Sequence, residues 1–246
     1  MVENGKVIEV KNLTKKFGDF IANSNLTFSV GRGEIFGFLG ANGAGKTTAI
    51  RILCGLLEPT SGEILVAGFD GYTQRNKIKR NIGYMSQRFS LYEDLTVKEN
   101  IRLFGGIYGL SNKEIKARTK QLLTEIDMEK QADWLIAALP LGWKQKLAFS
   151  VAMVHNPKIV FLDEPTGGVD PITRRNFWEI IYRVARAGTT VFVTTHYMDE
   201  AEYCDRVCIL VDGVIEALDS PLNLKSKYSA NNMDEVFLKL ARKVTS

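Results

Sequence analysis

A glycine-rich stretch between two hydrophobic segments constrains this chain more than any other feature. Residues 35–39 (IFGFL) are almost entirely apolar, and residues 40–47 (GANGAGKT) match the pattern G-x-x-x-x-G-K-[ST]. Apolar residues then recur at Ile50, Leu53, Cys54 and Leu57, the spacing of one helix face. The order predicts a buried strand, a phosphate-binding loop and a helix.

The residue types in the loop suit a polyphosphate ligand. Glycine at positions 40, 43 and 45 lets the backbone N–H groups close around phosphate oxygens. Lys46 would bring a positive charge to the β- and γ-phosphates, and the Thr47 hydroxyl suits a Mg²⁺ ion. The helix N-terminus that follows favours anions. The residues expected to contact the nucleoside triphosphate are Gly40, Ala41, Asn42, Gly43, Ala44, Gly45, Lys46, Thr47 and Thr48.

Composition excludes several classes of protein. The 246 residues are 45% hydrophobic and 24% charged, which is typical of a globular chain. The net charge of +4 is too small and too evenly spread to indicate nucleic-acid binding, but it is compatible with an anionic membrane face. The polar first 16 residues do not resemble a signal peptide, and no apolar run reaches the ~18 residues of a membrane span. We therefore expect a cytoplasmic protein whose membrane role, if any, requires a separate chain.

The three cysteines, Cys54, Cys204 and Cys208, lack C-x-x-C spacing. This favours reduced thiols and no metal site.

The first part of the chain is rich in strand patterns. Alternating Leu26, Phe28 and Val30 precede Gly31-Arg32-Gly33, which predicts a hairpin leading into strand 35–39. Further strands are expected at 7–10, 63–67 and 81–86. This pattern predicts an antiparallel sheet beside a nucleotide-binding core.

Residues 91–156 contain helical patterns and no convincing strand. Capping boxes begin helices at Thr96 and Ser111, with Glu99 and Glu114 three residues later. The segment 141–155 is apolar almost all round, so it should be a buried helix. We expect His155, just before Pro157, to have a structural role.

An α/β pattern returns after residue 156. Asp170 and Pro171 predict a helix start, with Asp170 as the N-cap. Strands are expected at 159–162, 190–194, 207–211 and 214–216, with a short helix through Glu200 and a final helix at 232–243. The predicted fold class is α/β: a P-loop NTPase core with a mixed, mostly parallel sheet, an antiparallel β subdomain and an inserted α-helical subdomain. The predicted division is a core (1–86 and 157–220), a helical subdomain (87–156) and a C-terminal helical extension (221–246).

Two carboxylates complete the expected site. Strand 159–162 is followed at once by Asp163 and Glu164. Ligands bind at the carboxyl ends of strands in open α/β sheets. Asp163 would hold Mg²⁺, directly or through water, and Glu164 could polarise the attacking water as a general base.

The order of motifs resembles that of the ATP-binding cassette (ABC) ATPases over essentially the whole chain. The resemblance rests on the phosphate loop and on the stretches 163–166 (DEPT), 168–170 (GVD) and 195–196 (TH). Stretches 84–92 (YMSQRFSLY) and 196–202 (HYMDEAE) look most like the ATP-binding subunits of daunorubicin-resistance-type exporters.

The resemblance implies further site residues. Phe17 would stack on adenine, although an ordinary strand-end aromatic fits it as well. Gln87 would contact Mg²⁺ and the attacking water, His196 would hydrogen-bond the γ-phosphate, and Asp170 would face a second subunit besides capping its own helix. The alternative role of Gln87 is that of a polar strand cap. Catalysis is thus assigned to Glu164, His196 and Gln87, and the metal to Thr47, Gln87 and Asp163.

The resemblance also implies partners. Two copies, or this chain and a similar one, would sandwich two ATP molecules with Mg²⁺, each held in trans by the loop around Gly142. A membrane-spanning permease subunit would dock near residues 87–100, where Arg88, Tyr92 and Glu93 are the expected exposed contacts. The chain would then drive export while lying on the inner face of the membrane.

One motif departs from the family pattern. At residues 139–145 (LPLGWKQ) the family usually has Leu-Ser-Gly-Gly-Gln, so Pro140 replaces the serine and Leu141 the first glycine. The hydroxyl is lost, and proline has no N–H, although it suits a first helical turn. A lost hydrogen bond to a charged group costs about 1.5–3 kcal/mol, or one to two orders of magnitude in turnover.

Most other classes of nucleotide-binding protein need sequence features that this chain lacks. A DNA-repair cassette needs a long coiled coil between Lys46 and Asp163, and a ribosome-associated cassette protein usually carries two phosphate loops. A GTP-binding switch needs an Asn-Lys-x-Asp motif, which the sequence lacks. A nucleotide-gated module with little hydrolysis stays open because of Pro140 and Leu141.

Overall fold

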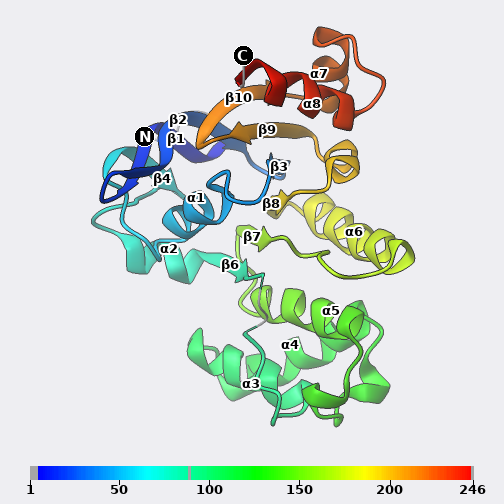
Figure 1. The fold of residues 1–246 in the computed structure, drawn as a ribbon. Coiled ribbons are helices and arrows are strands. Elements are labelled where there is room, and N and C mark those ends of the chain that lie inside the picture. Colours follow the sequence, from blue (N-terminus) through cyan, green and yellow to red (C-terminus); the bar gives the residue numbers. More distant parts are fainter. Residues whose placement is uncertain (1–4, 88–89, 245–246) are drawn as a thin grey trace.

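The computed structural model describes residues 5–87 and 90–244 and contains two β-sheets with helices around them (Figure 1). The larger sheet has six strands in the order β10-β9-β3-β8-β7-β6. The smaller sheet has four strands in the order β2-β1-β4-β5. The arrangement agrees with the predicted α/β class with an antiparallel part and an added helical part.

The strands whose ends form the predicted phosphate-binding site belong to the six-stranded sheet. Its strands are β3 (Ile35–Leu39), β6 (Ile82–Met85), β7 (Ile159–Asp163), β8 (Thr190–Thr195), β9 (Arg206–Val211) and β10 (Val214–Asp219). All neighbours pair in parallel except β9 and β10, which form a hairpin at Asp212-Gly213. Strand β8 lies between β3 and β7, so the two halves of the expected site are separated by one strand.

The antiparallel sheet corrects one prediction. It consists of β1 (Lys6–Phe17), β2 (Phe20–Gly31), β4 (Ser61–Val66) and β5 (Phe69–Asp70). The predicted hairpin across Gly31-Arg32-Gly33 is wrong, because β2 pairs with β1 whereas β3 pairs with β8 and β9 in the other sheet. The turn, with Gly33 at a φ of 74°, carries the chain from one sheet to the other. A turn motif does not specify which strand supplies the hydrogen-bond partners.

Alternate residues of the central strands face two separate cores. Phe36, Phe38 and Phe192 pack with Phe28 of β2, and their ring centroids lie 5.2–6.3 Å apart. This core joins the two sheets, and α1 (Lys46–Leu53) belongs to it. The opposite face of the larger sheet buries its residues against α5, α6 and α8. The larger sheet is therefore covered on both faces. This packing holds in place the strand ends that form the candidate site.

The helical part follows local sequence signals closely. The capping boxes predicted at Thr96 and Ser111 are both present, and they begin α3 (Val97–Ile107) and α4 (Asn112–Glu125). Helix α5 (Leu141–Ala152) is largely buried, as expected, but ends three residues earlier than predicted. Figure 1 shows these three helices together at the β6 end of the larger sheet.

The remaining helices include two that the sequence analysis missed. Helix α6 (Pro171–Arg186) begins after the predicted Asp170 cap, and α8 (Met233–Val244) is close to its predicted range. The missed helices are α2 (Arg75–Asn81) and α7 (Pro221–Lys227). The short helix through Glu200 is a 3₁₀ helix, η3 (Met198–Tyr203). Two further 3₁₀ turns are η1 (Glu129–Gln131) and η2 (Ile136–Ala138). Among the helices of residues 5–87 and 90–244, none combines the length and the hydrophobicity of a membrane span.

The three cysteines lie inside the two cores. Cys54, Cys204 and Cys208 are buried, unpaired thiols. Burial raises the pKa of each thiol. The thiols are therefore held in their neutral form inside the fold.

His155 lies where the helical part meets the central sheet. Its ring stacks on Tyr108, the C-cap residue of α3, with centroids 3.6 Å apart, and its Nε2 lies 3.0 Å from the carbonyl oxygen of Ile82 in β6. Burial lowers the pKa of His155 to about 4 from its ordinary value of 6.5. The contact is thus made by a neutral imidazole.

We expect this contact to make the protein sensitive to mild acid. The unfolded chain takes up the His155 proton first, so stability is lost as the pH falls from about 6.5 to about 4. Because the ring is partly exposed, the loss should be about 1–2 kcal/mol. His155→Phe keeps the stack on Tyr108 and cannot be protonated. Urea unfolding at pH 7 and pH 5 should therefore show a smaller loss for the variant, and equal losses would contradict the assignment.

Candidate active site

The loop after β3 has the backbone shape that the glycine pattern predicted. Gly43 and Gly45 have φ values of 85° and 95°, and Gly45 is the N-cap of α1. A Cβ atom on Gly45 would lie 2.3 Å from the carbonyl oxygen of Ala22, and the Gly45 carbonyl accepts a hydrogen bond from Asn23 Nδ2 at 3.2 Å. The loop is thus packed against β2, and only glycine fits at this point.

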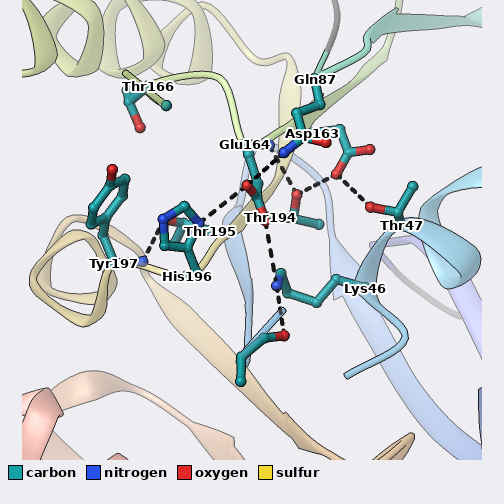
Figure 2. A network of polar contacts seen from close by, with 12 residues as sticks. Lys46, Thr47, Gln87, Asp163, Glu164, Thr166, Thr194, Thr195, His196 and Tyr197 are labelled. Atoms are coloured by element: carbon teal, nitrogen blue, oxygen red, sulfur yellow. Dashed lines mark hydrogen bonds and ion pairs between the residues drawn. The ribbon is translucent and has the colours of Figure 1, made fainter. Parts of the chain in front are cut away.

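Lys46 lies at the centre of the site. Its ammonium group donates to the carbonyl oxygens of Gly40 at 2.8 Å and Ala41 at 3.1 Å, and it lies 3.4 Å from Glu164 Oε1. Burial lowers the pKa of Lys46, and the nearby Glu164 carboxylate opposes this effect. The loop therefore holds a partly desolvated positive charge beside a carboxylate, as Figure 2 shows.

Asp163 ends β7 and faces the start of α1. Its Oδ1 accepts hydrogen bonds from Thr194 Oγ1 at 2.7 Å and from Thr47 Oγ1 at 3.3 Å. Burial raises the pKa of this carboxyl group, and the hydrogen bond from Thr194 opposes the rise. A hydroxyl and a carboxylate side by side are the oxygen donors that Mg²⁺ prefers.

Glu164 connects three segments that are distant in the sequence. Its Oε2 accepts a hydrogen bond from Gln87 Nε2 at 3.0 Å and lies 3.1 Å from His196 Nδ1, which is not aligned for a hydrogen bond. Its backbone φ is 49°, and its N–H donates to Thr194. A non-glycine residue in this region is strained and is often found at functional sites.

The arrangement brings together six of the predicted residues: Lys46, Thr47, Gln87, Asp163, Glu164 and His196. A cationic, glycine-lined loop at a helix N-terminus can bind phosphate groups, and the hydroxyl and carboxylate beside it can hold a hard cation. In the described part of the chain, no cluster of three or more His, Cys, Asp or Glu residues could hold a metal by itself. A cation here would share its coordination with the phosphate groups of the ligand.

A family model described as "ABC transporter" matches residues 23–167, which is more than half of the chain. The chain belongs to the ABC transporter family. The match includes the phosphate loop, Asp163 and Glu164. The prediction that the loop binds ATP is thus supported by the family as well as by the geometry of the site.

Relatives within the ABC transporter family cover nearly all of this chain. The probable multidrug ABC transporter ATP-binding protein YbhF of Escherichia coli K12 is 48% identical over 240 residues, covering 95% of this chain and 41% of the relative. The chain thus spans less than half the length of that relative. The Nod factor export ATP-binding protein I of Rhizobium sp. strain N33 is 36% identical over 231 residues, covering 94% of this chain and 76% of the relative.

Solved structures agree with this fold. An ATP-binding subunit of an ABC transporter matches with a TM-score of 0.85 and 31% identity, covering 95% of this chain and 99% of the other. The ATP-binding cassette MJ0796, as a dimer in a post-hydrolysis state with ADP and Pi, matches with a TM-score of 0.78 and 29% identity, covering 87% and 98%. The predicted fold class is confirmed by these ABC transporter cassettes.

Three predicted residues lie outside the Glu164 network. Phe17 is about half exposed at the end of β1, with Lys15 Nζ 4.9 Å from its ring centroid. Asp170 caps α6 by accepting from the N–H groups of Ile172 and Thr173, both at 3.0 Å. Gly142 lies in the first turn of α5 and packs against Thr173. Their roles toward adenine and a second subunit stay predictions, while the capping role of Asp170 is confirmed.

The departure from the family motif has a clear structural form. Pro140 is the N-cap of α5, with a φ of −57° and a ψ of 153°, and its carbonyl accepts from the N–H groups of Trp143 and Lys144. Leu141 and Gly142 therefore begin the helix, where N–H groups have no acceptor within the helix. The helix start is preserved although the serine hydroxyl is absent.

We expect Gly142→Ala to destabilise the contact between α5 and α6. The added Cβ would lie 2.6 Å from Thr173 Cγ2, so either the Thr173 side chain or the two helices must shift, at a cost of about 1–3 kcal/mol. Thr173→Ser removes that methyl group and keeps the hydroxyl that donates to Asp170. In urea unfolding, the loss caused by Gly142→Ala should be smaller in the Thr173→Ser background. A loss of the same size in both backgrounds would contradict the proposed clash.

The sequence analysis missed two site residues. Thr194 donates to Asp163, and Asn23 donates to the Gly45 carbonyl. Asn23 is fully buried within β2, but its burial is a property of the folded chain that the sequence does not display. The position of Thr194 depends on the register of β7 with β8, which places it opposite Asp163.

Proposed function

We propose that this chain is the ATP-binding and ATP-hydrolysing subunit of an ABC exporter, driving a separate membrane-spanning subunit from the inner face of the membrane. The relatives named above as multidrug and Nod factor export ATP-binding proteins support export. The stretches 84–92 and 196–202 favour the daunorubicin-resistance-type branch.

One observation carries the proposal. The Glu164 carboxylate lies at the end of β7 beside the phosphate loop, in contact with Lys46, Gln87 and His196. A carboxylate in this place can accept a proton from a water molecule that attacks a bound γ-phosphate. Mg²⁺ would be held by Thr47, Asp163 and Gln87, and it would neutralise charge on the phosphate oxygens.

Assembly as a dimer completes the proposed site. Asp170 and Ile172 lie at the start of α6, and the Ile172 side chain is 74% exposed. Gly142 lies close to them because it packs against Thr173, whose hydroxyl donates to Asp170. The free N–H groups at the start of α5 would then face the γ-phosphate of ATP bound by the other subunit. Phe17 is exposed enough to stack on adenine.

A groove of about 700 Å³ is the proposed docking site for the membrane subunit. It lies between the β6 region and α3, and its apolar lining includes Tyr84, Phe104, Ile107 and Tyr108. Two of the predicted contact residues, Tyr92 and Glu93, belong to the segment between β6 and α3. Tyr92 is half exposed, and Glu93 forms an ion pair with Lys144 at 2.9 Å. Arg88 was also predicted there, but it lies outside the described residues.

The experiment that tests the proposal is ATP hydrolysis by the purified chain with Mg²⁺, together with sizing in the presence and absence of ATP. The proposal expects phosphate release and ATP-dependent dimers. If no phosphate is released, the assay is repeated with the membrane subunit in vesicles, and inactivity there would refute an ATPase role.

A second candidate is a nucleotide-gated module with little hydrolysis. Pro140 favours it, since the residue supplies neither a hydroxyl nor an N–H to a phosphate. This alternative expects ATP-dependent dimers without phosphate release, so the same pair of measurements distinguishes the two.

A further inference from the structure

A buried carboxylate lies next to the active site but has no part in the chemistry proposed above. Glu200 in η3 is 0% exposed, and its Oε1 accepts a hydrogen bond from Thr166 Oγ1 at 2.5 Å. Its Oε2 has no hydrogen-bond partner among the described residues. A buried charge is costly unless it is paired, so its surroundings are informative.

The cation beside Glu200 comes from a different element. Arg174 of α6 places its Nε 3.5 Å from Glu200 Oε1, and its Nη1 donates to Asp199 Oδ2 at 3.3 Å. The same guanidinium group lies over the Tyr197 ring, with Cζ 4.0 Å from the centroid. One side chain of α6 therefore contacts three residues of the segment that follows β8.

That segment carries His196. The rings of His196 and Tyr197 pack against each other, with centroids 4.1 Å apart and ring planes at 37°. The Tyr197 N–H donates to Thr195 Oγ1 at 3.0 Å. Figure 2 shows Tyr197 beside His196, on the side away from Glu164. Tyr197 thus supports His196 on the side away from Glu164, and Arg174 in turn stacks on Tyr197.

The start of α6, which carries Arg174, lies at the surface proposed for dimerisation. Helix α6 begins at Pro171, next to Asp170 and the exposed Ile172, and Arg174 follows one residue after Thr173. Thr166 belongs to the turn that joins Glu164 to Asp170. Glu200 therefore ties together the turn after Glu164, helix α6 and the His196 segment.

We propose that Arg174 and Glu200 are positioning residues that couple the start of α6 to the alignment of His196 with Glu164. This inference rests on the proposed function. His196 Nδ1 is 3.1 Å from Glu164 Oε2 but is not aligned for a hydrogen bond, so a small rotation of the His196 segment completes the contact. A partner subunit that pushes on Asp170 and Ile172 would cause that rotation through Arg174 and Tyr197.

The test uses the full chain and two conservative variants. Glu200→Gln keeps an acceptor for Thr166 and removes the charge that attracts Arg174. Arg174→Lys keeps the charge and loses the planar group that stacks on Tyr197. The matched control is Arg175→Lys, an exposed arginine next to Arg174 on the same helix.

Imidazole NMR signals provide a direct measurement of position. The chain has two histidines, so His196 can be followed while His155 reports on the rest of the fold. We expect the His196 signals to move in both variants and to stay in place in Arg175→Lys, with His155 unchanged in all three. We also expect ATP turnover to fall about tenfold while the Kd for a fluorescent ATP analogue changes less than about twofold.

Two results would overturn the proposal. One is His196 signals that coincide with those of the unmodified chain in both variants. The other is a shift of the His155 signals as large as that of His196, together with weaker resistance to urea, which would indicate a general structural role. If the unmodified chain does not hydrolyse ATP even with the membrane subunit, the proposed function fails, but the NMR comparison still decides whether Arg174 and Glu200 position His196.

Discussion

Glu164→Gln should stop ATP turnover while leaving ATP binding intact. The amide has the shape of the carboxylate, and its one oxygen can still accept from either Lys46 or Gln87, but it cannot accept a proton from water. Removing a general base of this kind lowers the rate by about 10²–10⁴-fold. Phosphate release should therefore become nearly undetectable, while binding of a fluorescent ATP analogue changes little.

The same variant should accumulate as an ATP-bound dimer. If hydrolysis separates the subunits, a variant that cannot hydrolyse ATP stays closed, and sizing with ATP and Mg²⁺ will show it. The matched control is Glu179→Gln, which changes the net charge equally at an exposed position of α6. Turnover within about threefold of the unmodified chain in Glu164→Gln would show that another group activates the water.

Gly45→Ala should abolish ATP binding and weaken the fold. The new Cβ would lie 2.3 Å from the Ala22 carbonyl oxygen and 2.5 Å from Asn23 Nδ2, and the φ of 95° is strained for alanine. The loop must then leave β2 and lose the hydrogen bond from Asn23. We expect a loss of about 2–4 kcal/mol in the free energy of unfolding by urea, together with no detectable binding of the ATP analogue.

Gly43→Ala is the matched control for this change. Its φ of 85° is similarly strained, but a Cβ there would have no neighbour within 4 Å. The loss of stability should be about 1 kcal/mol, from backbone strain. If both variants lose the same free energy of unfolding, backbone strain alone explains the loss. Contact between the loop and β2 would then not be the reason for glycine at position 45.

The sequence predicted those features that depend on a few neighbouring residues. The phosphate loop, the capping boxes at Thr96 and Ser111 and the cap at Asp170 are all local patterns, and the structure has each of them. Helix α2 was missed because its sequence, RNKIKRN, contains one apolar residue and so has no hydrophobic periodicity.

Features that depend on pairing between distant segments could not be predicted in the same way. The hairpin expected at Gly31-Arg32-Gly33 failed because β3 finds its partners more than 150 residues further along the chain. Thr194 was missed as a site residue for the same reason, since the register of β7 with β8 decides which side chain meets Asp163. The Arg174–Glu200 contact likewise depends on how α6 packs, which no spacing in the sequence reveals.

The position of β3 in the larger sheet has a consequence for the synthesis of the protein. This strand carries the phosphate loop, yet it pairs with β8 and β9 and has Ile35 opposite Val191. Until the ribosome has made residues 190–211, β3 lacks both of the strands with which it pairs. We therefore expect the loop to take its nucleotide-binding shape only after β8 and β9 have been made, so that ATP stabilises the assembled sheet rather than its first steps of folding.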